Sequence, residues 1–248
     1  MFRLATAAGA SLGAAALAHW QLRSGSERAP RLERWQGRWD DSITSWHLDE
    51  LNPVLEKHLP AIAPLPRAGV PRARVLFPLC GASVDLSQLA LRGYEVVGIE
   101  AIGLALERLR REFEEQQPAP GLLKGLMRGV QADFIELDAQ TRAELGKFDA
   151  SFDRGALVAV TPEDRPKYAE TLTSLMATGG KVLLVAVEHE PAFGPPYSVD
   201  GSEVRRLFGR DFEVRELSRE DKFALEPRWK ERGATRFEEV TYVLTKRG

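Results

Sequence analysis

The chain has 248 residues, 44% of them hydrophobic, a length and composition that suit one α/β domain with a large core. The net charge of −2 excludes a general attraction to nucleic acid or to an anionic membrane surface. The single cysteine, Cys80, excludes an intrachain disulfide and is typical of a protein from a reducing compartment.

Residues 1–28 differ in composition from the remainder, so we treat them as an extension and expect the folded domain at residues 29–248. The extension has no acidic residue before Glu27, contains several arginines, and is filled with alanine, glycine and leucine. A mitochondrial presequence, a weakly apolar membrane anchor over residues 4–22, and a disordered extension all remain open. The first two predict a mitochondrial or a membrane-anchored protein.

Past residue 30, strand and helix signals alternate. A short tryptophan-rich segment covers residues 32–39, and a helix is predicted to begin near Pro53. The elements predicted after these are a strand at 74–77, a helix at 83–91, a strand at 95–99, a helix at 103–116, strands near 127–132 and at 148–152, a helix opened by Thr161-Pro162, a buried strand at 181–189, a short helix capped by Asp200, and strands at 212–221 and 236–248. This alternation predicts a doubly wound, mainly parallel α/β sheet with helices on both faces.

In such a sheet ligands bind beyond the carboxyl ends of the strands, so the residues after each strand are the candidates. Gly81 follows the first strand and lets the backbone approach a ligand closely. It is the only glycine of a G-x-G-x-x-G fingerprint that is present, which disfavours NAD and FAD. Glu100 follows the second strand, where an acid can accept both ribose hydroxyls of a nucleoside. An ordinary turn and a solvated acid are the alternatives.

Charged residues also follow the third and fourth strands. Asp133 and Phe134 stand where an acid can accept an adenine amino hydrogen and an apolar neighbour can pack on the ring, although a surface loop explains them equally well. Asp153 and Arg154 lie between apolar segments, and such a charged pair is costly to desolvate unless it is a structural ion pair or functional. The proline-rich loop after the buried strand is placed to cover a substrate.

No metal site and no hydrolytic triad is predicted. The four histidines are scattered without metal-ligand spacing, and no G-x-S-x-G stretch is present. Cys80 has no evident base partner, so we interpret it as a small packed residue.

From about residue 32 to its end, the chain resembles the thiopurine S-methyltransferase family. The stretches that carry the resemblance are WQGRW, WH at 46–47, FPLCG, VVGIE, GKFDASFDRGALVAV, DRPKYAETLTSLM, GPPYSV and EVRRLFG. The resemblance implies a Rossmann-like, seven-stranded sheet with an antiparallel C-terminal strand and an N-terminal helical cap. It also implies S-adenosyl-L-methionine as cofactor and methyl transfer to the sulfur of a small thiol of the thiopurine type.

The resemblance assigns cofactor-binding roles to residues from six stretches. The tryptophans belong to the cap, the next three residues line the methionine and ribose side, and the following two occupy the adenine positions; Arg154 also contacts the cofactor. The residues so assigned are Trp35, Trp39, Trp46, Leu79, Gly81, Glu100, Asp133, Phe134 and Arg154. Trp46 stands where the family usually has phenylalanine.

On the acceptor side, Arg154 resembles the family's substrate-contacting arginine, and Asp153 beside it is a candidate proton relay. Arg228 matches a second substrate arginine, in a stretch two residues longer than in the family. Pro195 and Pro196 belong to the predicted substrate loop. The resemblance further implies a monomer in the cytoplasm whose partner is a small molecule, with no nucleic acid and with membrane contact only if residues 1–28 form an anchor.

Three other readings share the predicted sheet. A methyltransferase for halide, selenide, sulfide or a small aliphatic thiol would differ only in its substrate loops. An NAD-dependent dehydrogenase would share Glu100 but needs the missing glycines. A non-catalytic nucleoside-binding module would not need Asp153 and Arg154.

Overall fold

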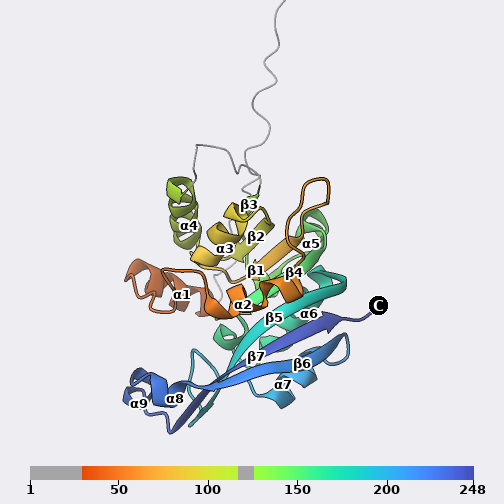
Figure 1. Cartoon of the computed structure of the whole chain (residues 1–248). Coiled ribbons are helices and arrows are strands. Elements are labelled where there is room, and N and C mark those ends of the chain that lie inside the picture. The colour runs from red at the N-terminus through yellow and green to blue at the C-terminus, as the bar shows by residue number, and fades with distance from the viewer. Residues whose placement is uncertain (1–29, 117–125) are drawn as a thin grey trace, which may run out of the picture.

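The computed structural model describes residues 30–116 and 126–248, so the predicted extension at residues 1–28 lies outside the described residues. The strands in the described parts are β1 (Arg74–Pro78), β2 (Glu95–Glu100), β3 (Met127–Gln131), β4 (Phe148–Arg154), β5 (Met176–Glu190), β6 (Phe212–Asp221) and β7 (Arg236–Lys246). They form one seven-stranded sheet in the order β3-β2-β1-β4-β5-β7-β6 (Figure 1). The predicted α/β sheet is confirmed.

The pairs from β3 across to β5 are parallel, and β7 runs antiparallel to both β5 and β6. The expected antiparallel C-terminal strand is therefore β7. The strand order reverses between β1 and β4, which creates a topological switch point. Ligands of open α/β sheets bind at such a point, beyond the carboxyl ends of the strands.

The helices are α1 (Pro30–Asp40), α2 (Pro53–Ile62), α3 (Val84–Leu91), α4 (Gly103–Gln116), α5 (Ala139–Leu145), α6 (Arg165–Leu175), α7 (Gly201–Phe208), α8 (Lys222–Leu225) and α9 (Arg228–Glu231), with short 3-10 turns η1 (Phe134–Glu136) and η2 (Leu157–Ala159). One apolar cluster joins α2, α3 and α4 to the sheet, and a second joins α5, α6 and α7 to it. Within the described parts of the chain, no helix is long and apolar enough to cross a bilayer.

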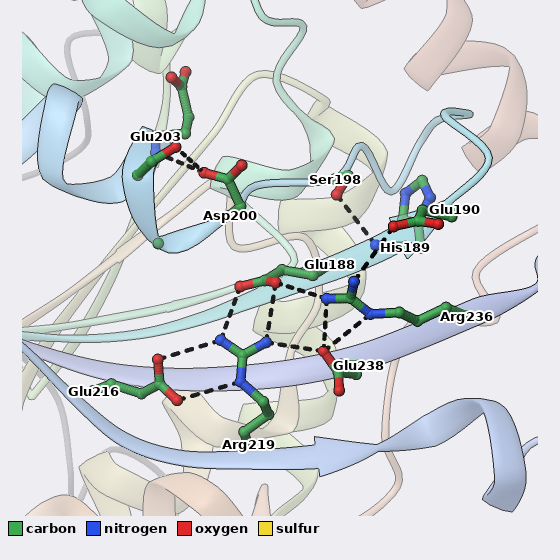
Figure 2. Close-up of polar contacts among 12 residues, drawn as sticks. Glu188, His189, Glu190, Ser198, Asp200, Glu203, Glu216, Arg219, Arg236 and Glu238 are labelled. Carbon is green, nitrogen blue, oxygen red and sulfur yellow. Dashed lines mark hydrogen bonds and ion pairs between the residues drawn. The ribbon is translucent and has the colours of Figure 1, made fainter.

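Side-chain caps fix where several helices begin. The Asn52 side chain accepts from the N–H groups of Val54 and Leu55 at the start of α2. Ser83 caps α3 in the same way. Asp200 Oδ1 accepts from the Glu203 N–H at 2.8 Å, which is the predicted cap of α7 (Figure 2). A side-chain acceptor satisfies an N–H that the first helical turn cannot pair.

Two predicted boundaries were wrong. The helix expected from Thr161-Pro162 begins at Arg165, because the Thr161 carbonyl accepts from the N–H groups of Asp164 and Arg165 in a separate turn that suits Pro162. The strand β4 extends to Arg154, so Asp153 and Arg154 belong to the strand instead of following it. Their side chains consequently point to opposite faces of the sheet.

Candidate active site

A cavity of about 580 Å³ opens at the carboxyl ends of the strands, a size suited to a small-molecule ligand. Its wall comes from α1, the loop before α2, the turns after β1 to β4, the proline-rich loop and the region of α8 and α9. The predicted site residues that line it are Trp35, Trp39, Trp46, Leu79, Gly81, Glu100, Asp133, Phe134, Arg154, Pro195, Pro196 and Arg228. Asp153 is the predicted site residue that does not line it.

The turn after β1 brings the backbone against the cap. Leu79 and Gly81 both have positive φ, 45° and 54°. A Cβ on Gly81 would lie 2.7 Å from Nε2 of His47 and 3.3 Å from the Trp39 ring. Glycine is required here for two reasons, because other residues disfavour this backbone and because a side chain has no space. Cys80 beside it is buried, and its Sγ fills the space that a Cβ on Gly98 would occupy, as expected of a packed residue.

The Glu100 carboxylate is buried and fixed by two backbone donors. Gly81 N–H donates to Oε2 and Ile102 N–H donates to Oε1, both at 2.9 Å. Burial raises the pKa of Glu100, while these N–H groups oppose the increase. A carboxylate oxygen accepts more than one hydrogen bond, so both oxygens keep acceptor capacity toward the cavity. Glu100 is therefore not a solvated acid.

The cap is an aromatic cluster. Trp46 meets Trp35 edge to face at a centroid distance of 5.5 Å and Trp39 at 6.3 Å. His47 packs on Trp39, and its Nε2 accepts from the Ala82 N–H at 3.3 Å, which places the ring proton on Nδ1. Burial, followed by the charges of Arg108 and Arg154, lowers the pKa of His47 to about 4. His47 is thus neutral at pH 7.

Asp133 has a contact that its sequence did not indicate. Its Oδ2 pairs with Arg31 of α1, and its Oδ1 accepts from the Ile135 N–H at 3.1 Å. Arg31 also lies 3.7 Å from Asp164. Asp133 therefore fastens the cap helix to the strand ends as well as lining the cavity. Phe134 beside it is buried and packs against Tyr168.

Asp153 and Arg154 do not form an ion pair. Asp153 is fully buried on the face of α6, where Oδ1 accepts from the Leu157 N–H at 3.0 Å and Oδ2 accepts from the Tyr168 hydroxyl at 2.6 Å. Burial raises the pKa of Asp153 to about 6. Because Asp153 faces away from the cavity, the expected proton relay through it is wrong. It braces the turn that follows β4.

Arg154 lines the cavity on the opposite face of β4. Its Nη1 donates to the carbonyl oxygen of Trp46, which ties the strand end to the cap. The guanidinium has five N–H donors, so this bond leaves donors for a ligand. Arg154 therefore lines the cavity at the point where the strand end meets the cap.

The wall opposite Glu100 combines aromatic rings and charges. Trp229 and Phe237 stack at 3.7 Å with an interplanar angle of 7°. Arg228 lies over Trp229 and pairs with Glu226. Arg232 donates to the Pro195 carbonyl at 3.0 Å, joining this wall to the proline-rich loop. Phe237 also stacks on His189 at 5.4 Å, and both Phe237 and Trp229 are buried, so these rings give the wall an apolar aromatic lining while their faces are packed against protein groups.

Sequence reasoning missed three acids in the same wall, Glu220, Glu226 and Glu239, and it gave no role to His47. The alternation of the strand at 236–248 was a signal for Glu239, since every second residue faces the same side. No local pattern indicated Glu220 and Glu226.

Comparison with known proteins decides the family. The sequence profile of the thiopurine S-methyltransferase family matches residues 31–247. The chain belongs to this family. A thiopurine S-methyltransferase from Xanthomonas campestris pv. campestris is 36% identical over 218 residues, 85% of this chain and 96% of the relative. Another, from Equus caballus, is 34% identical over 233 residues, 89% of this chain and 91% of the relative.

Among solved structures, a Burkholderia thailandensis 1,6-didemethyltoxoflavin-N1-methyltransferase with bound S-adenosylhomocysteine has a TM-score of 0.60 at 16% identity, covering 90% of this chain and 93% of the other. This likeness shows the fold. The family resemblance, the Rossmann-like methyltransferase fold and dependence on S-adenosyl-L-methionine are all confirmed.

The residues present in this thiopurine S-methyltransferase family member fit the cofactor. The Glu100 carboxylate, fixed by the Gly81 N–H, lines the cavity with oxygen acceptors that suit ribose hydroxyls, and the aromatic rings of the cap line the same cavity. The cofactor has no pyrophosphate, so the turn after β1 does not need the second and third glycines of a dinucleotide fingerprint. The scarcity of glycines noted in the sequence follows from the ligand.

Proposed function

We propose that this chain transfers a methyl group from S-adenosyl-L-methionine to the sulfur of a small, planar thiol of the thiopurine type. The observation that carries the proposal is a single cavity with Glu100 and Gly81 on one wall, the Trp229–Phe237 stack on the other, and Arg154 between them. A nucleoside and a flat acceptor can therefore meet beside a cation.

On the cofactor side, Glu100 accepts the ribose hydroxyls, and Asp133 and Phe134 hold the adenine end. When bound, the cofactor supplies a methyl group activated by a sulfonium charge. Trp35, Trp39 and Trp46 cover this side, and their rings exclude water and suit a cation. Arg31 keeps the cap closed through Asp133.

On the acceptor side, the nucleophile is a thiolate. Arg154 stabilises that anion, and its hydrogen bond to the Trp46 carbonyl fixes the guanidinium. Trp229 and Phe237 give this side an apolar aromatic lining, while Pro195 and Pro196 form the adjoining edge with Arg228. Catalysis rests mainly on alignment, because bringing two reactants together in one geometry lowers the barrier by several kcal/mol, about 7–11 in the best cases.

Arg154→Ala tests the proposal. We expect radiolabelled methyl transfer to a thiopurine to fall about 100-fold, because a charge-assisted contact to the nucleophile is worth about 1.5–3 kcal/mol. Cofactor affinity in a calorimetric titration should change by less than about threefold. Arg92→Ala, at an exposed pair with Glu56, is the control. An equal loss of cofactor affinity would refute the acceptor role of Arg154.

A comparison of methyl acceptors of different classes decides between this proposal and a methyltransferase for another soft nucleophile. Thiopurine, aliphatic thiol, selenide and iodide would be compared with the wild-type protein. The apolar lining that Trp229 and Phe237 give to the cavity favours an aromatic acceptor over a small hydrated ion. A higher kcat/KM for iodide or selenide than for thiopurine would favour the alternative.

We also propose a monomer that acts in the cytoplasm, following the family. Size-exclusion chromatography with light scattering tests the first statement, and N-terminal sequencing of the native protein tests whether residues 1–28 are removed. A mass of two chains in solution would contradict the monomer.

A further inference from the structure

Neighbouring glutamates on β7 have different surroundings. Glu238 belongs to a charged network on one face of β5, β7 and β6, where Arg219 and Arg236 lie among Glu188, Glu216 and Glu238 (Figure 2). Side chains alternate along a strand, so Glu239 points to the opposite face. On that face Glu239 lines the cavity, and Glu238 does not.

Six other carboxylates line the cavity, and each already has a donor or a cation. Two of them bind backbone N–H groups, and four pair with arginine or lysine. These six are Asp85, Glu100, Asp133, Asp164, Glu220 and Glu226. Among the residues that the structure describes, no hydrogen-bond donor or cation contacts the side-chain carboxylate of Glu239. It is the carboxylate in the wall that remains available to a ligand.

The groups around Glu239 place it at the acceptor end. In the sheet register it lies between Val187 of β5 and Glu220 of β6. Arg154 of β4 pairs with Val185 of β5, and Val185 lies two residues before Val187, the partner of Glu239. Burial raises the pKa of Glu239, the charges of Lys222 and Arg154 oppose this, and those of Glu220 and Glu226 add to it. Glu239 is therefore a half-buried carboxylate whose negative charge interacts with the positive charge of Arg154, the arginine assigned to the acceptor.

We propose that Glu239 is the general base that removes the acceptor's thiol proton. The sulfur–hydrogen bond breaks and the proton passes to a carboxylate oxygen of Glu239. The electron pair left on sulfur forms the new sulfur–carbon bond as the bond between that carbon and the sulfonium sulfur breaks. Glu239 then releases the proton to solvent. This inference rests on the proposed function, because it needs a thiol acceptor.

The other candidate bases either face away from the cavity or are already held by other hydrogen bonds. Asp153 faces away from the cavity, and His47 presents a protonated Nδ1 while its Nε2 holds Ala82. Glu100 is fixed on the cofactor side by Gly81 and Ile102. A carboxylate whose pKa is raised toward that of the thiol is better matched to proton transfer than an ordinary surface acid.

Glu239→Gln tests the inference with a series of aromatic thiols of graded acidity, assayed at pH 7. The most acidic members are already thiolates and need no base, so their kcat/KM should stay within about threefold of wild type. The least acidic members should lose about 100-fold, the usual contribution of a general base. For these thiols the wild-type rate should rise with pH through a carboxylate ionisation that the variant lacks.

Glu238→Gln is the matched control, because it removes the neighbouring charge from the opposite face. It should leave the dependence on thiol acidity unchanged. Calorimetric titration with the cofactor and thermal melting should show that Glu239→Gln binds cofactor and folds as wild type does.

Two outcomes separate the inference from the proposed function. An active Glu239→Gln variant whose loss is the same for every thiol, or absent, would overturn Glu239 as base. Wild-type protein that binds cofactor and methylates no thiol in the series would overturn the proposed function, and the inference with it.

Discussion

The two walls of the cavity hold their polar groups by different means. On the cofactor wall, at the ends of β1 and β2, Glu100 is fixed by the backbone N–H groups of Gly81 and Ile102. On the acceptor wall, at the ends of β5, β7 and β6, glutamates pair with side chains such as Lys222 and Arg228. Backbone donors have few degrees of freedom, whereas long side chains reorient. A rigid cofactor wall faces an adaptable acceptor wall.

This difference between the two walls also explains why the sequence predicted the residues of the cofactor wall better than those of the acceptor wall. The cofactor wall consists of short turns directly after strands, so Gly81 and Glu100 are found by position alone. The acceptor wall joins residues from β5, β6 and β7 through antiparallel register, as in the row Val187, Glu239 and Glu220. Such a row exists only once the strands are paired.

Gly81→Ala should give the largest loss of cofactor affinity, because Gly81 belongs to the cofactor wall, where the backbone holds the polar groups. The new Cβ would meet His47 and Trp39 on a backbone with φ of 54°. We expect the cofactor Kd to rise about 100-fold from displacement of the cap, equivalent to about 3 kcal/mol. Calorimetric titration measures it.

Gly69→Ala is the control, since Gly69 has φ of 77° with open space around it. It should cost about 1–2 kcal/mol of unfolding free energy and leave cofactor affinity unchanged. Equal Kd values for the two variants would contradict the rigid wall.

Asp153→Asn concerns the strand between the two walls. The pKa of Asp153 is about 6 in the folded protein against an ordinary 3.8. The folded state therefore binds this proton more tightly, and the carboxyl's contribution to stability is complete below pH 3.8 and lost as pH rises through about 6. That difference corresponds to about 3 kcal/mol.

Asparagine keeps an acceptor for Leu157 and does not titrate, so relative to wild type Asp153→Asn should become more stable by up to about 3 kcal/mol between pH 4 and 7. Denaturant unfolding at several pH values measures this. Methyl transfer by Asp153→Asn should stay within about threefold of wild type; loss of turnover with an intact fold would restore Asp153 to the reaction.

Glu100→Gln should weaken cofactor binding about 10- to 100-fold, since hydrogen bonds to a charged acceptor are worth about 1.5–3 kcal/mol. Glu95→Gln, at the other end of β2 in a half-buried pair with Arg74, should leave the Kd unchanged. A matching loss in both variants would mean that strand stability, and not the carboxylate, sets affinity.

Arg219→Gln should give the smallest effect. It removes contacts to Glu188, Glu216 and Glu238 on the face away from the cavity. Exposed ion pairs contribute about 0.2–1 kcal/mol each and are screened by salt, so the melting temperature should fall by a few degrees at low salt and less at high salt. A change in kcat would show that the network supports the acceptor wall directly.

The sequence by itself determined the alternation of strands and helices, the family, and the residues that follow β1 and β2. These depend on local periodicity, turns and caps, which act over a few residues. The sequence nevertheless predicted that Asp153 and Arg154 both follow the strand, because the pattern did not show that β4 extends to Arg154.

Only the tertiary structure decided which of those two side chains faces the cavity and that Arg31 fastens Asp133. It also decided that, within residues 30–116 and 126–248, no donor contacts the Glu239 carboxylate while Glu220 and Glu226 are paired. Each depends on groups between roughly 15 and 100 positions apart in the chain, such as Asp153 with Tyr168 and Arg31 with Asp133. Chain packing brings these groups together, and a one-dimensional pattern does not record the distances between them.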